Sequence, residues 1–382
     1  MNTVERHGHY MNDRVFEYFG VSPDSPEWRD WKWQYKNRIT DAGRLSKILS
    51  LTESETKGLE FCAQNFRMAV TPYFASLMDP ENPDCPVRLQ AVPTADEARV
   101  LPWEKKDPLS EARHSPVENI VHRYPDRALF TISRQCAMYC RHCIRKTKMG
   151  EEGAFIGERE AQAALGYIRE TPQIRDVLVS GGDPLMMDDA RLEKIISQLR
   201  DIEHVEIIRI GTRAPSVIPM RITHALLSML RKYQPVWINV QFNHPDELTP
   251  DSVKACQDIA DAGIPLGNQS VLLKNVNDDA ETMKRLLLGL VKARVRPYYL
   301  YQCDLCEGVG HFRTRVEVGI EMIRKLTGNI SGFAVPKFVI DSPGGGGKIP
   351  INPEYIISID DKQIVMRNYE GDVYAYPQPV TA

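Results

Sequence analysis

The sequence lacks any long apolar run and carries no strong excess of either charge. No segment offers the roughly 18 consecutive apolar residues of a membrane span, and the first residues, MNTVERHGHYMNDR, lack the apolar core of a signal peptide. The formal net charge is −3 over 382 residues, so a broad attraction to nucleic acid or anionic lipid is not expected. We therefore predict a cytoplasmic protein that acts on a small molecule, without nucleic-acid or membrane partners.

Cysteines are too sparse for a disulfide framework. Eight are scattered through a chain that is 42% hydrophobic and 26% charged, a composition typical of one large globular domain with extensions. Dense disulfide frameworks belong to small secreted domains, whereas clustered thiols in a reducing compartment indicate a metal or catalysis. The tightest cluster is CAMYCRHC, which contains Cys136, Cys140 and Cys143.

From Arg127 onward, short β-rich runs alternate with helix-like stretches. The runs are RALFTIS, RDVLVSGG, VEIIRIGTR, PVWINVQF, IPLGNQSVLL and VRPYYLYQ. After the first gap they recur at roughly the length of a βα unit. This alternation predicts an α/β fold with a complete or partial parallel barrel. An open doubly wound sheet shares the pattern and remains the alternative.

The flanking segments differ from this central region. Apolar spacing predicts helices in PEWRDWKWQYKNRI and SLTESETKGLEFCAQNFRMAV, and a proline-rich, acidic stretch follows from Met78 to His122. We predict a helical N-terminal domain and linker over 1–115, a barrel over 116–341, and a C-terminal segment over 342–382. The last segment ends in a short β-rich tail that we expect to cap the barrel.

Polar and glycine-containing segments follow the predicted strands: CAMYCRHC, SGGDP, GTRAP, NHPDE, GNQS and CDLCEG. Parallel barrels build their active sites from such loops, at the carboxyl ends of the strands. Three thiolates from one loop can hold an iron–sulfur cluster and leave one iron open. A structural zinc site needs four closed ligands, and ordinary reduced loop cysteines are the plainer alternative. For Cys303 and Cys306 we predict buried thiols rather than a second metal site.

The motif CAMYCRHC resembles the radical S-adenosylmethionine superfamily and, within it, the lysine 2,3-aminomutase family. The resemblance extends over nearly the whole chain, in order and spacing, through WRDWKWQYKNRI, HRYPDR, TPQIRDVLVSGGDPL, HVEIIRIGTRAP, ADAGIPLGNQSVLL, RVRPYYLYQCDL, GHFRT and VIDSPGGGGKIP. It implies an isomerase with a partial (βα)6-type parallel barrel, a helical N-terminal extension and a short C-terminal cap.

The resemblance implies three cofactors. A [4Fe–4S] cluster would bind S-adenosylmethionine at its open iron and supply the electron that forms a 5′-deoxyadenosyl radical. The cluster ligands would be Cys136, Cys140 and Cys143, and the methionine amino group would meet Ser180, Gly181, Gly182 and Asp183. Lys348, after four glycines, would carry pyridoxal phosphate through a Schiff base. The phosphate and ring contacts of that cofactor would come from Arg123, Tyr124, Arg127 and Gln269.

The resemblance also implies a cationic amino acid as the substrate. Arg145 would pair with its carboxylate, while Asp304 and Asp341 would bind the distal ammonium. Two acids that face one site repel each other unless a cation lies between them. We expect L-lysine to be converted to L-β-lysine. Arginine is the alternative, because a guanidinium could pair bidentately with both carboxylates. The expected partners are an electron donor such as flavodoxin or ferredoxin and further copies of this chain.

The chain departs from the family pattern at several points. It ends without the cysteine-rich tail that supplies zinc ligands, and Asp279 stands where a zinc cysteine is expected, so we expect no zinc-mediated subunit contacts. CIRKTK replaces CTRRR, and VQFNHP replaces THFNHP. Two other functions share part of this pattern. The lysyl-protein-modifying aminomutases lack the helical lead-in, and a non-catalytic iron–sulfur or zinc-binding regulatory module leaves Lys348, Arg145 and the acidic pair unexplained.

Overall fold

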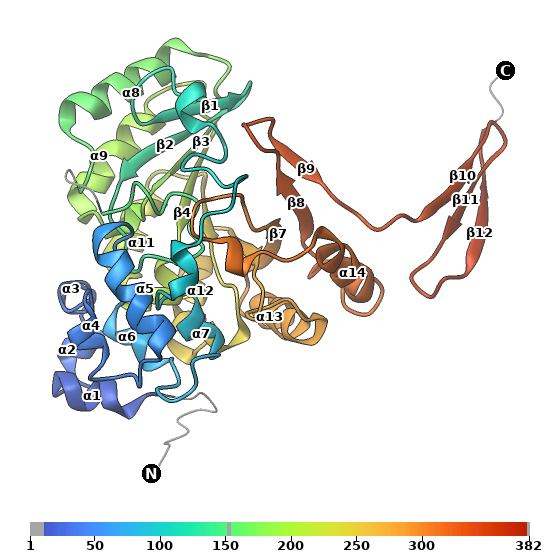
Figure 1. The fold of residues 1–382 in the computed structure, drawn as a ribbon. Coiled ribbons are helices and arrows are strands. Elements are labelled where there is room, and N and C mark those ends of the chain that lie inside the picture. The colour runs from blue at the N-terminus through green and yellow to red at the C-terminus, as the bar shows by residue number, and fades with distance from the viewer. Residues whose placement is uncertain (1–10, 151–153, 380–382) are drawn as a thin grey trace.

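The computed structural model describes residues 11–150 and 154–379. A helical lead-in comes first, a curved nine-stranded sheet follows, and a small three-stranded sheet ends the chain (Figure 1). The outer ends of the predicted first and last segments, residues 1–10 and 380–382, lie outside the described part. The boundaries between the three predicted segments remain predictions. The helical elements of the lead-in end at His114, and the first strand begins at Ile120.

The lead-in is built from short helices whose first residues are capped by side chains. Thr52 and Glu55 form a reciprocal capping box at the start of α5, which satisfies amide groups that the helix itself leaves open. The helices are α1 (Asp13–Phe19), α2 (Pro26–Arg29), α3 (Trp31–Lys36), α4 (Ala42–Leu45), α5 (Glu53–Gln64), α6 (Pro72–Ser76) and α7 (Pro86–Leu89), followed by the 3₁₀ turns η1 (Ala95–Ala98) and η2 (Glu111–His114).

The first predicted helix is divided into two. Asp30 takes an extended conformation with φ −88° and ψ 114°, ends α2, and caps α3 by accepting from the Lys32 amide at 2.9 Å. An aspartate competes with helix formation in this way because its short side chain bonds to nearby backbone. Both parts of the predicted segment are helical, but the hydrogen bond from the Lys32 amide to the Asp30 side chain separates them.

The nine-stranded sheet has its strands in sequence order, with β2 to β8 mutually parallel and β1 and β9 antiparallel at the two edges. A doubly wound sheet would reverse its order at a switch point, so the alternative is wrong and the partial barrel is confirmed. The strands are β1 (Ile120–Tyr124), β2 (Arg127–Ser133), β3 (Asp176–Gly181), β4 (Ile207–Thr212), β5 (Val236–Val240), β6 (Leu266–Leu272), β7 (Arg296–Gln302), β8 (Lys337–Asp341) and β9 (Lys348–Pro350).

Helices connect the parallel strands and bury one apolar stripe each against the sheet. In α8 this stripe is Ala161, Ala164, Leu165 and Ile168, spaced three or four residues apart. The connecting helices are α8 (Glu158–Glu170), α9 (Asp189–Arg200), α11 (His224–Arg231), α12 (Pro250–Asp261), α13 (Ala280–Lys292) and α14 (Val316–Leu326). Short turns follow several strands: η3 (Pro184–Met186), α10 (Ala214–Val217), η4 (Pro219–Arg221), η5 (Pro245–Glu247) and η6 (Gly310–Phe312).

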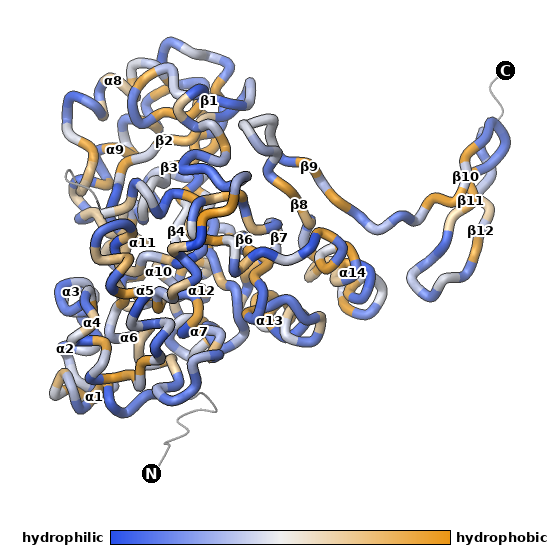
Figure 2. Tube along the Cα trace, viewed as in Figure 1, coloured by the Kyte–Doolittle hydropathy of each residue, from blue (hydrophilic) through white to orange (hydrophobic). Residues whose placement is uncertain are grey.

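The C-terminal segment divides into two parts. Strand β9 returns along β8 after a glycine turn, which is pale between two apolar strands in Figure 2. The remaining strands, β10 (Ile356–Ile359), β11 (Gln363–Arg367) and β12 (Val373–Pro377), form their own antiparallel sheet, which stands apart from the barrel in Figure 1. No described residue of this small sheet lines the cavity of the barrel, so the expected cap over the barrel is not seen in this structure.

A buried ion cluster ties the lead-in to the loop after β2. Glu97 of η1 accepts from Arg141 at 2.8 and 2.6 Å and from the Lys146 ammonium at 2.7 Å. All three side chains are buried. Burial alone would raise the pKa of Glu97, but the two cations outweigh it and lower that pKa to about 2. The lead-in thus fixes the loop that contains the cysteine triad.

Removing this anion should destabilise the fold strongly. Glu97→Ala leaves the buried Arg141 and Lys146 side chains without their carboxylate partner, which we expect to reduce the free energy of unfolding by about 3–5 kcal/mol. Glu53→Ala breaks an exposed pair with Lys57 in the same region and should cost less than about 1 kcal/mol. Guanidinium unfolding of both variants measures the difference, and equal losses would contradict the assigned role of Glu97.

Candidate active site

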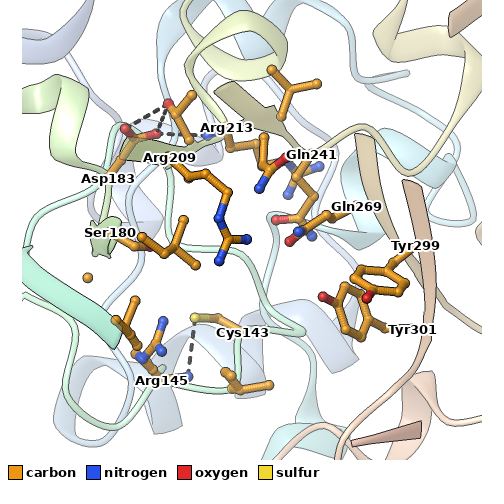
Figure 3. A pocket seen from close by; sticks show the side chains of 18 of the residues that line it. Cys143, Arg145, Ser180, Asp183, Arg209, Arg213, Gln241, Gln269, Tyr299 and Tyr301 are labelled. Carbon is orange, nitrogen blue, oxygen red and sulfur yellow. Dashed lines mark hydrogen bonds between the residues drawn. The ribbon is translucent and has the colours of Figure 1, made fainter. Parts of the chain in front are cut away.

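One cavity of about 800 Å³ is lined from β1 through β9 and by the loops at the carboxyl ends of the parallel strands. Figure 3 shows Cys143, Arg145 and Ser180 around one part of it and Gln269, Tyr299 and Tyr301 around another. Every predicted site residue lines this cavity: Arg123, Tyr124, Arg127, Cys136, Cys140, Cys143, Arg145, Ser180, Gly181, Gly182, Asp183, Gln269, Asp304, Asp341 and Lys348. The structure therefore brings the residues together, while their individual roles stay predictions.

The three cysteines come from the loop that follows β2, and their thiols repel one another when charged. Burial raises the pKa of Cys136, and Asp183 and Cys143 raise it further. Burial also raises the pKa of Cys143 to about 11, with a contribution from Cys140. Among the described residues, no three His, Cys, Asp or Glu side chains are grouped as ligands of one metal ion. Buried thiols that disfavour each other's charge suit a multi-iron cluster, which binds thiolates and supplies positive charge.

Two glycines let the end of β3 contact the beginning of the cysteine loop. Gly181 has φ +123°, and a side chain there would collide with the Ser133 backbone. A Cβ on Gly182 would lie 2.5 Å from the Gln135 carbonyl oxygen. Only glycine permits both the conformation and the approach. Both glycines also line the cavity, where their contact with S-adenosylmethionine remains a prediction.

Asp183 uses its carboxylate within the protein. It accepts from the Thr212 hydroxyl at 2.8 Å and from the Arg213 backbone amide at 2.9 Å (Figure 3). It also accepts from the Leu185 backbone amide at 3.0 Å. Burial nevertheless raises its pKa. The carboxylate joins the end of β3 to the end of β4. The contact of Ser180, Gly181, Gly182 and Asp183 with S-adenosylmethionine remains a prediction.

Arg145 meets a partner that the sequence did not reveal. Its Nε donates to both carboxylate oxygens of Glu111 at 3.1 Å, and Nη2 donates to the same carboxylate. Burial would raise the pKa of Glu111, but attraction to Arg145 outweighs it and the pKa is lowered. The ion pair occupies one edge of the guanidinium and orients the other edge, which is where a substrate carboxylate could bind bidentately.

The β8–β9 hairpin places Lys348 directly opposite Asp341. Gly345 and Gly347 have φ +91° and +94° in the turn, a conformation that L-residues rarely adopt. The Lys348 ammonium lies 3.2 Å from the Asp341 carboxylate and 5.4 Å from the centre of the Tyr301 ring. A primary amine is thereby held in the cavity beside an acid and an aromatic face.

Asp304 shares this part of the cavity with Asp341. Burial raises the pKa of Asp304 to about 7, and repulsion from Asp341 contributes, while Lys348, Arg123 and Arg145 act in the opposite direction. A carboxyl with this pKa is strongly disposed to accept a proton or a cation. The acidic pair therefore favours a positively charged ligand.

Two arginines lie near the Lys348 hairpin and fit a phosphate. Arg123 donates from Nη2 to the Leu109 carbonyl at 2.7 Å, and within the described chain its buried Nε has no partner. The Arg127 guanidinium stacks 3.8 Å above the Tyr124 ring, and the Tyr124 hydroxyl accepts the Lys348 amide at 2.9 Å. An arginine donor without a partner, near the lysine predicted to carry pyridoxal phosphate, suits the phosphate of that cofactor.

Comparison with known proteins agrees with this geometry. The pattern described as "Radical SAM superfamily" matches residues 130–287, and that described as "Lysine-2,3-aminomutase" matches residues 323–382. L-lysine 2,3-aminomutase of Clostridium subterminale is 51% identical over 370 residues, which cover 97% of this chain and 89% of the relative.

The chain belongs to the lysine 2,3-aminomutase family of radical S-adenosylmethionine enzymes. L-lysine 2,3-aminomutase of Bacillus subtilis is 50% identical over 97% of this chain and 79% of its own length. Glutamate 2,3-aminomutase of Clostridioides difficile is 44% identical over 91% of this chain and 82% of its own length. The predicted family is confirmed, and with it an isomerase of the superfamily whose cofactors are a [4Fe–4S] cluster and S-adenosylmethionine.

Several site residues of this lysine 2,3-aminomutase family member were missed in the sequence. Arg213 directly follows β4 in GTRAP, and Tyr301 faces the cavity one strand alternation after Tyr299, so strand position could have indicated both. Glu111 gave no signal, because it lies in the irregular proline-rich stretch and 34 positions before Arg145.

Asp279, which stands where the family pattern has a zinc cysteine, is the N-cap of α13 and accepts from the Thr282 amide at 2.9 Å.

No helix in the described ranges is long and apolar enough to cross a membrane. The predicted compartment, electron donor and subunit association remain predictions. Cys303 and Cys306 are buried as free thiols, and burial raises the pKa of Cys306 to about 12.

The iron content of cysteine variants should separate cluster ligands from structural thiols. Cys136→Ala, Cys140→Ala and Cys143→Ala should each abolish most iron and sulfide binding after anaerobic reconstitution. The loop supplies only three ligands, and the loss of any one leaves a second iron without a protein ligand. Cys303→Ala and Cys306→Ala should retain the content of the unmodified protein. Loss of iron in the last two variants, with retention in the first three, would reverse the assignment.

Proposed function

We propose that this chain is a lysine 2,3-aminomutase that moves the amino group of L-lysine from C2 to C3 and produces L-β-lysine. Its cofactors would be a [4Fe–4S] cluster, S-adenosylmethionine and pyridoxal phosphate. Family membership supports the reaction class, and relatives at about half identity bear the name L-lysine 2,3-aminomutase. The choice of lysine depends mainly on the buried acidic pair.

The choice of lysine as the substrate rests on one observation: an alkylammonium group, that of Lys348, already lies beside the acidic pair of Asp304 and Asp341. The Lys348 ammonium lies against Asp341, in a cavity that also contains Asp304. Once Lys348 is engaged with pyridoxal phosphate, its ammonium no longer neutralises these acids. The distal ammonium of a lysine substrate has the same chemistry and can take that place. A glutamate side chain would instead meet two carboxylates.

Arg145 supplies the complementary charge for the carboxylate of the substrate. It lies on the cysteine loop, whereas Asp304 follows β7 and Asp341 is the last residue of β8. A ligand with a carboxylate at one end and a cation at the other can contact both groups across the cavity. Glu111 holds Arg145 by one edge, which reduces the entropy lost when the carboxylate binds.

The cofactor residues would keep the reacting atoms in place. Cys136, Cys140 and Cys143 would hold the cluster, and Ser180 to Asp183 at the end of β3 would receive S-adenosylmethionine. Lys348 would hold pyridoxal phosphate, whose phosphate Arg123 and Arg127 would bind, with Tyr124 and Gln269 beside it. When bound, these groups supply a hydrogen-abstracting radical and a carrier for the migrating nitrogen. The chain binds, orients and shields the substrate.

The proposal includes two partners. A one-electron donor such as flavodoxin or ferredoxin would reduce the cluster. Self-association is supported by the C-terminal sheet, where Ile356, Ile359, Val373 and Tyr376 are exposed although such side chains are usually covered.

The direct test is incubation of the anaerobically reconstituted enzyme with lysine, arginine, glutamate or norleucine, followed by chromatography for β-amino products. Lysine should be turned over best. Asp341→Asn should lower kcat/KM for lysine by roughly 10- to 100-fold, because a charge-assisted contact is lost, and should reduce the preference over norleucine, which has no ammonium. Asp258→Asn, on the exposed side of α12, is the matched control. A preference unchanged in Asp341→Asn, or better turnover of arginine, would contradict lysine as the substrate.

The pKa of Asp304 implies a pH dependence. Its carboxyl is charged above about pH 7 and neutral below it, whereas the lysine ammonium stays charged in this range. The kcat/KM for lysine should therefore fall as the pH drops through about 7. Asp304→Asn should have a lower kcat/KM and lose this step in the pH profile. An identical step in the variant would assign the titration to another group.

A further inference from the structure

Arg213 is the first residue after β4 and donates from Nη1 to the Cys140 sulfur at 2.9 Å. Its side chain is buried, and Figure 3 shows it beside Asp183 and Gln241 at the cavity. The bond joins a permanently charged guanidinium to one of the three sulfurs that would hold the cluster. Nothing in the binding of substrate requires this contact, so it needs its own explanation.

Two buried side chains from different parts of the fold hold the guanidinium in this position. Nη2 of Arg213 donates to the Gln90 amide oxygen at 2.6 Å and to the Glu247 carboxylate at 3.1 Å. Gln90 belongs to the lead-in, and Glu247 ends the turn after β5. Both are fully buried. These two contacts fix the orientation of the guanidinium, so that Nη1 points at the Cys140 sulfur.

Glu247 is itself fixed by several donors. It accepts from the Ser216 hydroxyl at 2.6 Å, from the Gln90 amide at 2.9 Å, and from the backbone amides of Asn243 and His244 at 3.1 and 3.0 Å. A carboxylate with so many partners does not move freely in a packed interior. Arg213 is therefore held rigidly by Glu247 of the barrel and by Gln90 of the lead-in.

Hydrogen bonds to the ligand sulfurs and nearby charge set the reduction potential of an iron–sulfur cluster. One-electron reduction adds a negative charge to the cluster, and a buried cation that donates to a ligand sulfur stabilises the reduced form more than the oxidised form. We propose that Arg213 raises the reduction potential of the cluster through Cys140, and that Gln90 and Glu247 position it for this task.

The plainer explanation is that Arg213 only neutralises Glu247. The two explanations differ in what they expect of the cluster. A purely structural arginine would affect folding and cluster content but would leave the potential of an assembled cluster unchanged. A tuning arginine changes the potential even when iron content and fold are normal. Arg213 acts through the cysteine sulfur, so it is a positioning and tuning residue rather than a catalytic one.

The test is a redox titration of the reconstituted full-length protein, without S-adenosylmethionine, followed by electron paramagnetic resonance of the reduced cluster. At a fixed potential, Arg213→Gln should lower the ratio of reduced to oxidised cluster by about tenfold, equivalent to about 59 mV for a one-electron couple. Arg209→Gln removes the same charge from the same cavity, but Arg209 donates to Asp176 at 2.7 Å, and its ratio should change less than about twofold.

A second measurement remains decisive if Arg213→Gln fails to fold or to hold iron. In protein labelled with [¹⁵N]arginine, the reduced cluster should show a hyperfine coupling to guanidinium nitrogen, and Arg213→Lys should abolish that coupling. An unchanged potential in an iron-replete Arg213→Gln, or no arginine coupling in the unsubstituted protein, overturns the proposal. These outcomes leave the aminomutase function intact. Failure of the cluster to assemble in the unsubstituted protein would overturn both.

Discussion

The site depends on the compensation of buried charge. Three thiols and several carboxyls line one cavity, and burial raises the pKa of Cys136, Cys143 and Asp304 because their charged forms lose contact with water. Each anion in this cavity therefore needs a fixed cation or, as for Asp183, several hydrogen-bond donors. Arg145 pairs with Glu111, Lys348 with Asp341, and Arg213 with Cys140 and Glu247. A charged ligand can bind where it takes the place of one of these partners, as a substrate ammonium would take the place of the Lys348 ammonium beside Asp341.

The helical lead-in is part of this arrangement rather than an accessory. The carbonyl oxygens of Ala69 and Gln90 accept the amides of Tyr139 and Arg141 at 3.0 and 2.9 Å, so the cysteine loop is bonded to the lead-in along its backbone. Glu97 adds a buried ion cluster to the same loop. A barrel alone would leave this loop exposed at its mouth. The lead-in makes it a rigid support for a metal cluster.

Strand positions were predictable because the parallel strands are buried runs of β-branched and apolar residues bounded by polar turns. RALFTIS is β2 without any change, and the other five predicted runs contain β3 to β7. Strand β1 was missed, although Pro125 and Asp126 form the turn that joins it to β2. The predicted site residues meet because parallel strands end at one edge. Glu111 could not be predicted, since its pairing with Arg145 exists only after the proline-rich stretch has folded over the loop.

The central claim is that three cysteines hold a four-iron cluster with one iron open. Mössbauer spectroscopy of protein reconstituted anaerobically with ⁵⁷Fe, recorded before and after addition of S-adenosylmethionine, measures this directly. The account predicts that one iron in four changes its spectrum when S-adenosylmethionine binds, while the other three keep theirs. Four irons that do not respond, or a protein that binds no iron, would contradict it.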